Sequence, residues 1–141
     1  MEIIYPTIKL DKNNLFLSIQ DSNITPTITL DYNLKKFYTL LMFDPDAVGG
    51  NKIHWLIVNI TQNDIFTGNT LIRYKGPAPP KGSGKHHYVI SLFRQHKFIE
   101  TKNIVLDSRF LGLDKLFILL KTNNNHFILK DIKYFVSKNN E

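Results

Sequence analysis

Short apolar runs dominate the hydrophobic pattern of the chain, and runs of this length are typical of β-strands rather than of helices. Phe37–Phe43 is an almost continuous apolar run that stops at an Asp-Pro pair, and His54–Ile60 is a second run of the same kind. Both patterns predict central strands that are buried on both faces. Tyr88–Arg94 predicts a third strand and Phe127–Val136 a final one, while Asn14–Ile19 alternates imperfectly and predicts a further strand.

One segment has the spacing of a helix. Apolar residues recur there at positions i, i+3, i+4 and i+7, namely Leu113, Leu116, Phe117 and Leu120. Ser108 or Asp114 would cap its N-terminus, and the three asparagines at 123–125 would end it. Because Ile118 and Leu119 add apolar side chains to its other face, we expect this helix to be enclosed by protein on most sides.

These elements predict a mostly β protein with one clear helix. The chain has 141 residues, the size of one ordinary domain, and no internal repeat or Gly/Ser-rich linker divides it. We therefore expect a single domain over residues 1–141. The stretch Thr67–Lys85 has no regular pattern and is expected to be irregular throughout.

Composition excludes several kinds of site and location. The sequence contains no cysteine, which excludes disulfides, thiolate catalysis and cysteine-based metal sites. No apolar run reaches the length of a transmembrane helix, and the first residues do not follow the pattern of a secretory signal. We therefore expect a cytoplasmic protein, in the host cytoplasm if the source is a virus.

Positive charge is concentrated in the second half of the chain. Residues 1–70 contain seven acidic and five basic side chains, residues 71–141 contain five acidic and thirteen basic ones, and the net charge is +6. A basic half favours phosphate groups on lipids, nucleic acids or proteins, although dispersed lysines equally keep a small domain soluble. Stacking motifs for bases are missing, so no specific nucleic-acid partner is expected. Without an amphipathic surface helix, membrane contact is expected to be transient at most.

The segment between residues 73 and 88 combines prolines, glycines, histidines and a tyrosine. Three prolines remove amide donors, and Gly82-Ser83-Gly84 then supplies donors on a backbone that can adopt positive φ. Such a turn can direct several N–H groups at one anion, although plain loops often have the same composition. If the next strand is extended, His86 and Tyr88 share a face beside this turn and His87 points to the surface. His86 would then either bind an anion or serve as an ordinary structural histidine.

Two carboxylates and another histidine lie at the ends of the predicted central strands. Asp44-Pro45-Asp46 is typical of an ordinary turn, but a carboxylate beside His54 or His86 would fix the tautomer of the ring and favour its protonated form. A protonated ring binds phosphate, and the other carboxylate would accept hydrogen bonds from an ammonium or hydroxyl group of the ligand. Strand alternation places His54 on the face of Leu56 and Val58.

Three segments in this order resemble the phosphatidylethanolamine-binding proteins, a family that includes the Raf kinase inhibitor proteins and the plant flowering regulators. They are Asp44-Pro45-Asp46-Ala47, His54-Trp55-Leu56-Ile57-Val58-Asn59, and Gly76-Pro77-Ala78-Pro79-Pro80-Lys81-Gly82 followed by His86 and Tyr88. The resemblance implies a β-sandwich-like fold with a large antiparallel sheet, a smaller sheet and one or two short helices. It also implies a surface pocket for phosphate-like anions and phospholipid headgroups, lined by Asp44, Asp46, His54, Pro79, Pro80, Gly82, His86 and Tyr88.

The resemblance is clear over residues 24–94 and weaker through the predicted helix. Val48 stands where many relatives have proline, and Ala78 replaces a glycine common in animal members, but neither change removes a polar ligand group. The chain ends just after its predicted final strand and so resembles a compact form of the family without the C-terminal helix. No tyrosine is therefore assigned to the rim of the pocket, Tyr134 included.

The resemblance implies a non-enzymatic, regulatory binding protein. Its expected partners are a phosphate-containing small ligand or phospholipid headgroup and a kinase or other signalling protein, and neither a cofactor nor a metal is expected. The alternative is a hydrolase in which an Asp–His pair acts on a phosphate or acyl ester in the same pocket. No persuasive nucleophile supports it, because Ser83 and Ser91 lie in no elbow motif. A metal site of His86, His54 and Asp44 would match no established zinc spacing.

Overall fold

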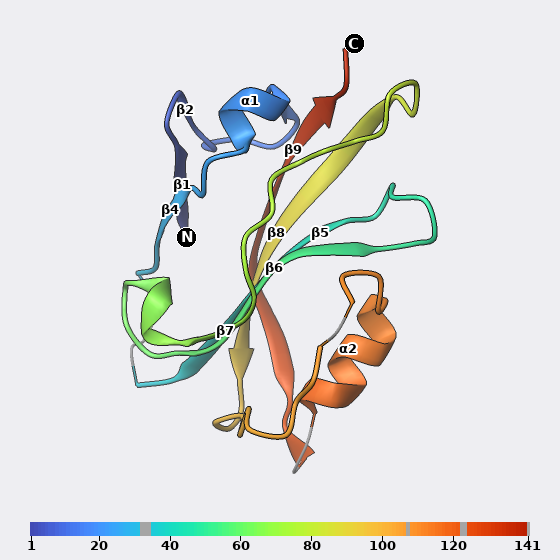
Figure 1. Cartoon of the computed structure of the whole chain (residues 1–141). Helices are drawn as coiled ribbons and strands as arrows, with labels where there is room; N and C mark the ends of the chain where they lie inside the picture. The colour runs from blue at the N-terminus through green and yellow to red at the C-terminus, as the bar shows by residue number, and fades with distance from the viewer. Residues whose placement is uncertain (32–34, 107, 122–123, 141) are drawn as a thin grey trace.

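The computed structural model describes residues 1–31, 35–106, 108–121 and 124–140, and its main element is a twisted six-stranded sheet (Figure 1). Neighbouring strands in this sheet are antiparallel except at one edge, where β3 runs parallel to β9. From edge to edge the strands are β3 (Leu15–Phe16), β9 (Phe127–Lys138), β8 (Lys85–Gln95), β5 (Phe37–Asp44), β6 (Lys52–Ile60) and β7 (Asn69–Ile72).

The large sheet is the middle of three layers (Figure 1). Ile3 of the smaller sheet packs with Met42 in one buried cluster, whereas Leu116 and Leu120 pack with Leu41 in the other. Leu41 and Met42 are adjacent in β5, so their side chains point to opposite faces of the sheet. The covering elements are β1 (Glu2–Tyr5), β2 (Ile8–Lys9), β4 (Thr27–Thr29) and α1 (Ile19–Ser22) on one side, and α2 (Leu113–Leu120) on the other.

The predicted mostly β fold, with a large sheet, a smaller sheet and two short helices, is confirmed. β5 lies between β8 and β6, and most of its side chains and those of β6 are buried, as the continuous apolar runs predict. The predicted strands at Tyr88–Arg94 and Phe127–Val136 form the cores of β8 and β9.

A β-bulge in β6 changes the direction of His54. β5 pairs with the residues on either side of His54 but skips His54 itself. Its ring packs edge-on against Tyr88, with the ring centres 5.3 Å apart, in the cluster that also contains Trp55. The prediction that His54 shares a face with Leu56 and Val58 is therefore wrong, because simple alternation assumes a regular strand.

The predicted strand Asn14–Ile19 is wrong for most of its length. Only β3 within it pairs with β9, and the chain then enters α1. Ser18 is the N-cap of this helix, because its Oγ accepts a hydrogen bond from the amide of Asp21 at 3.0 Å. The capping preference of serine thus outweighs a weak alternation of apolar side chains.

Helix α2 lies where it was predicted but is less enclosed. It packs against only one face of the large sheet, so Ile118 on its outer side is 72% exposed. Neither Ser108 nor Asp114 is its cap: the N-cap is Gly112, which forms no side-chain hydrogen bond. The helix ends at Leu120, and the first of the asparagines expected to end it lies outside the described residues.

The stretch Thr67–Lys85 is only partly irregular. A 3₁₀ turn, η1 (Ile65–Thr67), leads into β7, which pairs with β6, so the prediction of no regular element is wrong for its first part. Residues 73–84 contain no helix or strand. Among the described residues, no helix has the length and apolar character needed to cross a bilayer.

Candidate functional site

The ends of three neighbouring strands bring the predicted polar residues together. Asp44 is the last residue of β5, and Lys52, the first residue of β6, pairs with it. His86 and Tyr88 lie at the start of β8, which pairs with the other side of β5. Because these strands are antiparallel, the end of β5 lies between the beginnings of β6 and β8. Three stretches that are distant in the sequence thus meet at one end of these strands.

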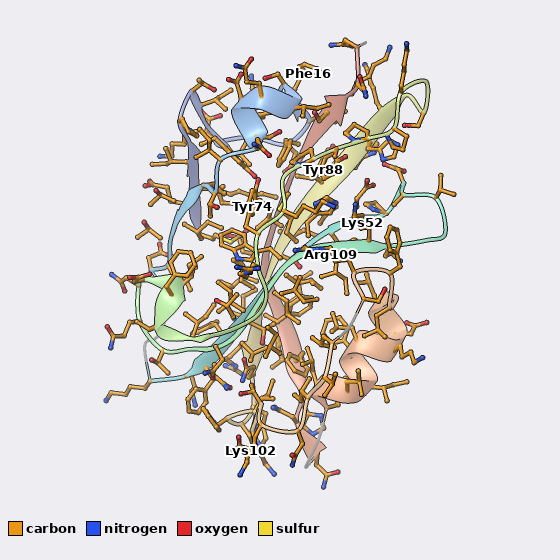
Figure 2. The ribbon with its side chains drawn as sticks, viewed as in Figure 1. Phe16, Lys52, Tyr74, Tyr88, Lys102 and Arg109 are labelled. Atoms are coloured by element: carbon orange, nitrogen blue, oxygen red, sulfur yellow. The ribbon has the colours of Figure 1, made fainter. Side chains whose placement is uncertain are left out.

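A cavity of about 120 Å³ opens at these strand ends. Six of the eight residues predicted for the pocket line it, namely Asp44, His54, Pro79, Pro80, His86 and Tyr88. Figure 2 shows Tyr88 and Lys52 in this region of the molecule. The residues of the lining that were not predicted are Ala47, Val48, Lys52, Ala78 and Phe110.

Asp44 and His86 form a buried ion pair on the wall of the cavity. His86 Nδ1 donates to Asp44 Oδ2 at 2.7 Å, and both side chains are less than 5% exposed. On the other side of the ring, Ser83 Oγ lies 2.9 Å from Nε2 while donating its own proton to the Pro80 carbonyl at 2.6 Å. Nε2 must therefore donate to Ser83. This pattern requires a proton on each ring nitrogen, so the geometry fits a positively charged imidazolium.

The other oxygen of the Asp44 carboxylate also accepts a hydrogen bond. Its Oδ1 accepts the amide of Asp46 at 2.8 Å, which closes the Asp-Pro turn. Burial raises the pKa of the Tyr88 phenol, and the negative charge of the nearby Asp44 carboxylate raises it further. Asp44 thus fixes the His86 ring and closes the Asp-Pro turn.

Unlike His86, His54 is a neutral ring. Burial lowers the pKa of His54 to about 4, against a smaller opposing effect of its hydrogen bond to Lys75. Nδ1 lies 2.6 Å from the Lys75 carbonyl oxygen, so the neutral ring donates from Nδ1 and carries its lone pair on Nε2. Nε2 is buried and has no hydrogen-bond partner among the described residues. A neutral ring with an unused acceptor therefore lines the same cavity as the cationic ring of His86.

The proline-rich segment over the cavity is held by hydrogen bonds to β6 and α1. The Lys75 amide donates to the His54 carbonyl at 2.9 Å, and the Arg109 guanidinium donates to the same carbonyl at 3.1 Å and to that of Arg73 at 2.9 Å. Gly76 then passes so close to the end of α1 that a β-carbon there would lie only 2.8 Å from a backbone atom of Asn23. These contacts fix where Pro79 and Pro80 lie.

Two predicted pocket residues, Asp46 and Gly82, do not line the cavity. Asp46 lies beyond the strand end and turns to His87, whose amide and Nδ1 both lie 2.7 Å from its Oδ2. Partial burial acts to raise the pKa of Asp46, but these hydrogen bonds outweigh it and the pKa is lowered. Gly82 has a φ of +79° in an exposed turn. His87 is exposed, as predicted, but it forms this ion pair.

A larger hollow of about 810 Å³ lies beside the same prolines. α1 and the end of β9 contribute to its lining, and among the described residues Lys138 is the one ionisable side chain there. The predicted groups Asp44, His54 and His86 line the smaller cavity instead. Among the described residues, no group of three or more His, Cys, Asp or Glu side chains is placed to hold a metal ion.

Among the five lining residues that were not predicted, sequence reasoning had a signal for Lys52 but none for Phe110. Lys52 is two residues before His54, so alternation alone would have placed both on one face. Phe110 comes from the irregular stretch before α2, and its ring lies 5.4 Å from Lys52 Nζ. No periodicity predicts that contact, because it depends on how this stretch folds back onto β6.

A family model described as phosphatidylethanolamine-binding protein matches residues 8–140. Among curated relatives, the putative odorant-binding protein A5 of Drosophila melanogaster is 40% identical over 74 residues, which cover 47% of this chain and 35% of that protein. The 26 kDa secreted antigen of Toxocara canis is 34% identical over 94 residues, which cover 62% of this chain and 36% of that protein. The matches thus span about a third of the length of these relatives.

Solved structures share the fold at low sequence identity. A carboxypeptidase Y inhibitor, solved in complex with its cognate proteinase, has a TM-score of 0.76 at 21% identity, covering 97% of this chain and 81% of that one. The phosphatidylethanolamine-binding protein of Plasmodium vivax has a TM-score of 0.64 at 16% identity, covering 97% and 84%. The fold agrees with the family-model match, which spans nearly the whole chain, and the chain belongs to the phosphatidylethanolamine-binding protein family.

Proposed function

We propose that this protein is a non-enzymatic binding protein that holds a phosphate group, free or in a phospholipid headgroup, in the cavity at the end of β5. The observation that carries the proposal is the presence of two unlike imidazoles on one small cavity. His86 has the hydrogen-bond pattern of a cation, and His54 is a neutral ring with a buried, unused acceptor. A phosphate matches both, because it is anionic and, when protonated, also carries a hydroxyl donor.

The proposed binding mode gives each group of the cavity one task. Phosphoryl oxygens lie near the positive ring of His86 and the ammonium group of Lys52, both of which line the cavity. A hydroxyl or ammonium group of the ligand donates to Nε2 of His54. Asp44 does not repel the anion, because the charge of its carboxylate is balanced by His86.

Isothermal titration calorimetry with inorganic phosphate and O-phosphorylethanolamine tests this proposal. We expect His54→Gln and His86→Asn each to weaken binding by about tenfold, and Asp46→Asn, which removes a carboxylate outside the cavity, to change it less than about twofold. Because His86→Asn leaves a buried carboxylate unpaired, thermal unfolding checks its fold, and His54→Gln serves as the second variant. Wild-type protein that binds neither ligand at millimolar concentration overturns the proposal.

One observation favours a second function, hydrolysis. Ser83, His86 and Asp44 form a hydrogen-bonded line with the order found in serine hydrolases. The Ser83 hydroxyl, however, donates to Pro80, so its proton is not directed at His86. We therefore expect p-nitrophenyl acetate and p-nitrophenyl phosphate to be hydrolysed no faster than in buffer. A rate above buffer that disappears in Ser83→Ala would replace binding by catalysis as the function.

Regulation of a kinase or another signalling protein through this cavity stays a prediction, as does transient contact with a membrane through a lipid headgroup. Location is also open to test. One curated relative is described as a secreted antigen, so the cytoplasmic location stays a prediction that fractionation of the source cells would check.

A further inference from the structure

Two histidines lie side by side at the end of the large sheet that is opposite the cavity. His96 directly follows β8 and His126 directly precedes β9, and the His96 amide donates to the His126 carbonyl at 2.9 Å. β8 has 11 residues, so this pair lies roughly 30 Å along the strand from His86. Figure 1 shows the two ends of β8 far apart. The pair is therefore separate from the site described above.

The ladder between β8 and β9 puts both imidazoles on one face. The last pair of its register is Gln95 with Phe127. The backbone hydrogen bond between the two histidines extends this ladder by one pair. Directly opposed residues of antiparallel strands point to the same side, with β-carbons about 5 Å apart. The ring centres of His96 and His126 are accordingly 5.6 Å apart, and the ring planes are inclined by 56°.

One buried side chain fixes the backbone that carries both rings. Asn125 is 2% exposed, and its Oδ1 accepts the amides of Lys97 and His126, each at 3.0 Å. Its Nδ2 donates to the Lys97 carbonyl at 2.9 Å, and Gln95 Nε2 donates to the same carbonyl at 3.1 Å. The two segments that carry the histidines are thus tied together. The spacing of the rings is therefore set by the fold, and such preorganisation lowers the entropy cost of binding a ligand.

The ring nitrogens of both histidines are available to a ligand. His96 and His126 are exposed. Among the residues that the structure describes, neither ring forms a hydrogen bond or an ion pair, and each contacts the other. His86 and His87 differ from them, because each of those rings is paired with an aspartate. The pair at the end of β8 thus has donor atoms that the fold itself does not use.

The spacing of the rings fits two ligands of one metal ion. Imidazole nitrogen binds Zn²⁺ at about 2.0–2.1 Å, and two imidazoles that share a tetrahedral ion have ring centres roughly 5 Å apart. The observed 5.6 Å differs from that value by no more than a small side-chain rotation changes. Ni²⁺, Cu²⁺ and Zn²⁺ accept imidazole ligands, whereas Mg²⁺ and Ca²⁺ prefer oxygen. The type of ligand atom therefore selects the late first-row ions.

We propose that His96 and His126 chelate one divalent ion of this class, with water in its remaining coordination positions. Each neutral imidazole supplies a nitrogen lone pair to the ion. The described residues place no third His, Cys, Asp or Glu side chain beside the pair, so the site has two protein ligands. Two ligands on one fixed backbone bind more tightly than either alone, because the second need not be brought from solution. The inference goes beyond the proposed function and does not depend on the phosphate cavity.

Calorimetric titration of the tag-free protein with Zn²⁺, in a phosphate-free buffer at pH 7.5, tests the chelate. We expect one tight site per chain, and we expect His96→Asn and His126→Asn each to weaken it at least about tenfold. Two independent surface histidines would instead lose half of their stoichiometry at unchanged affinity, and that result overturns the proposal. Wild-type protein that binds no Zn²⁺ at about millimolar concentration also overturns it. Because both side chains are exposed, each variant should keep the wild-type unfolding temperature.

Paramagnetic broadening in NMR spectra locates the ion. Cu²⁺ added at substoichiometric amounts should broaden the amide signals around His96 and His126 first, and excess Mg²⁺ should not prevent this. His87→Asn is the matched control, because His87 is also exposed but its Nδ1 is paired with Asp46. We expect this variant to keep the wild-type affinity for Zn²⁺. Broadening centred on His87, or an equal loss of Zn²⁺ affinity in His87→Asn, contradicts the assignment.

Discussion

The two histidines of the cavity differ in charge because their partners differ. His86 lies between a carboxylate and a serine oxygen that is itself a donor to Pro80, and only a doubly protonated ring satisfies both. His54 faces a carbonyl oxygen on one side, is deeply buried, and lies in the positive field of Lys52. Burial and neighbouring cations both disfavour a charged ring. One fold thus holds a cationic and a neutral imidazole side by side.

The lowered pKa of His54 predicts acid sensitivity of the fold. The folded ring has a pKa of about 4, below the ordinary value of 6.5, so the unfolded chain takes up this proton first as the pH falls. The stabilisation is complete above pH 6.5 and is lost as the pH falls from there toward 4. Between pH 7 and pH 5 we expect wild-type protein to lose about 2 kcal/mol more unfolding free energy than His54→Gln.

Urea denaturation at both pH values measures this difference. His54→Gln keeps every other titrating group, so acid effects of the remaining histidines and carboxylates cancel in the comparison. Equal pH dependence of the two proteins would mean that His54 is not buried as a neutral ring.

At the scale of elements, irregularities within strands place the functional residues. The bulge in β6 aims His54 at Tyr88, and a second irregularity at Asn59, which has a φ of +61°, anchors the chain that leads toward Phe110. The Asn59 amide group donates to the Ile99 carbonyl at 2.7 Å, and its Oδ1 accepts from the Ile99 amide at 2.8 Å. The other side-chain partners of Asn59 are Asn69 and Gln95.

Asn59→Gly tests whether these hydrogen bonds, rather than the backbone conformation, stabilise the region. Glycine accepts positive φ, so the loss reports the buried hydrogen bonds, and we expect about 3 kcal/mol of destabilisation in urea unfolding. Asn14→Gly is the matched control, because Asn14 also has positive φ, at +66°, but is exposed. We expect that control to change stability by less than about 0.5 kcal/mol. Similar losses in both variants would assign the effect to the backbone instead.

These irregularities are also the features of the fold that the sequence pattern did not predict. Long apolar runs correctly predicted β5 and β6, because burial on both faces leaves little choice of structure. Short or mixed segments did not: Ser18 starts a helix inside a predicted strand, and the bulge reverses the predicted face of His54. A bulge depends on pairing with a neighbouring strand, which local alternation does not contain.

At the scale of the whole molecule, the site depends on contacts between layers. Tyr5 of the small sheet and Tyr74 of the proline-rich segment join their hydroxyls at 2.8 Å, and Tyr74 donates to the Ser22 carbonyl at 2.7 Å. The small sheet, α1 and the segment over the cavity are thus connected through one side chain. Of the residues that line the cavity, those at the strand ends were recoverable from the sequence, whereas Phe110 was not, because its place depends on how the stretch before α2 folds back onto β6.

Tyr74→Phe tests that connection. The ring is kept, but Tyr5 and the Ser22 carbonyl lose a buried partner, so we expect a destabilisation of about 1–3 kcal/mol in thermal or urea unfolding. Because the segment that carries Pro79 and Pro80 is less fixed, phosphate affinity should also fall. A variant with unchanged stability and unchanged affinity would show that the small sheet does not support the site.

The most direct measurement of the central claim is a long-range proton–nitrogen NMR spectrum of the histidine rings, recorded with and without inorganic phosphate. We predict two protonated nitrogens in His86, one protonated nitrogen at Nδ1 of His54, and saturable shifts of the ring nitrogens of both when phosphate is added. Rings of equal protonation, or rings that phosphate at tens of millimolar leaves unshifted, would contradict the account.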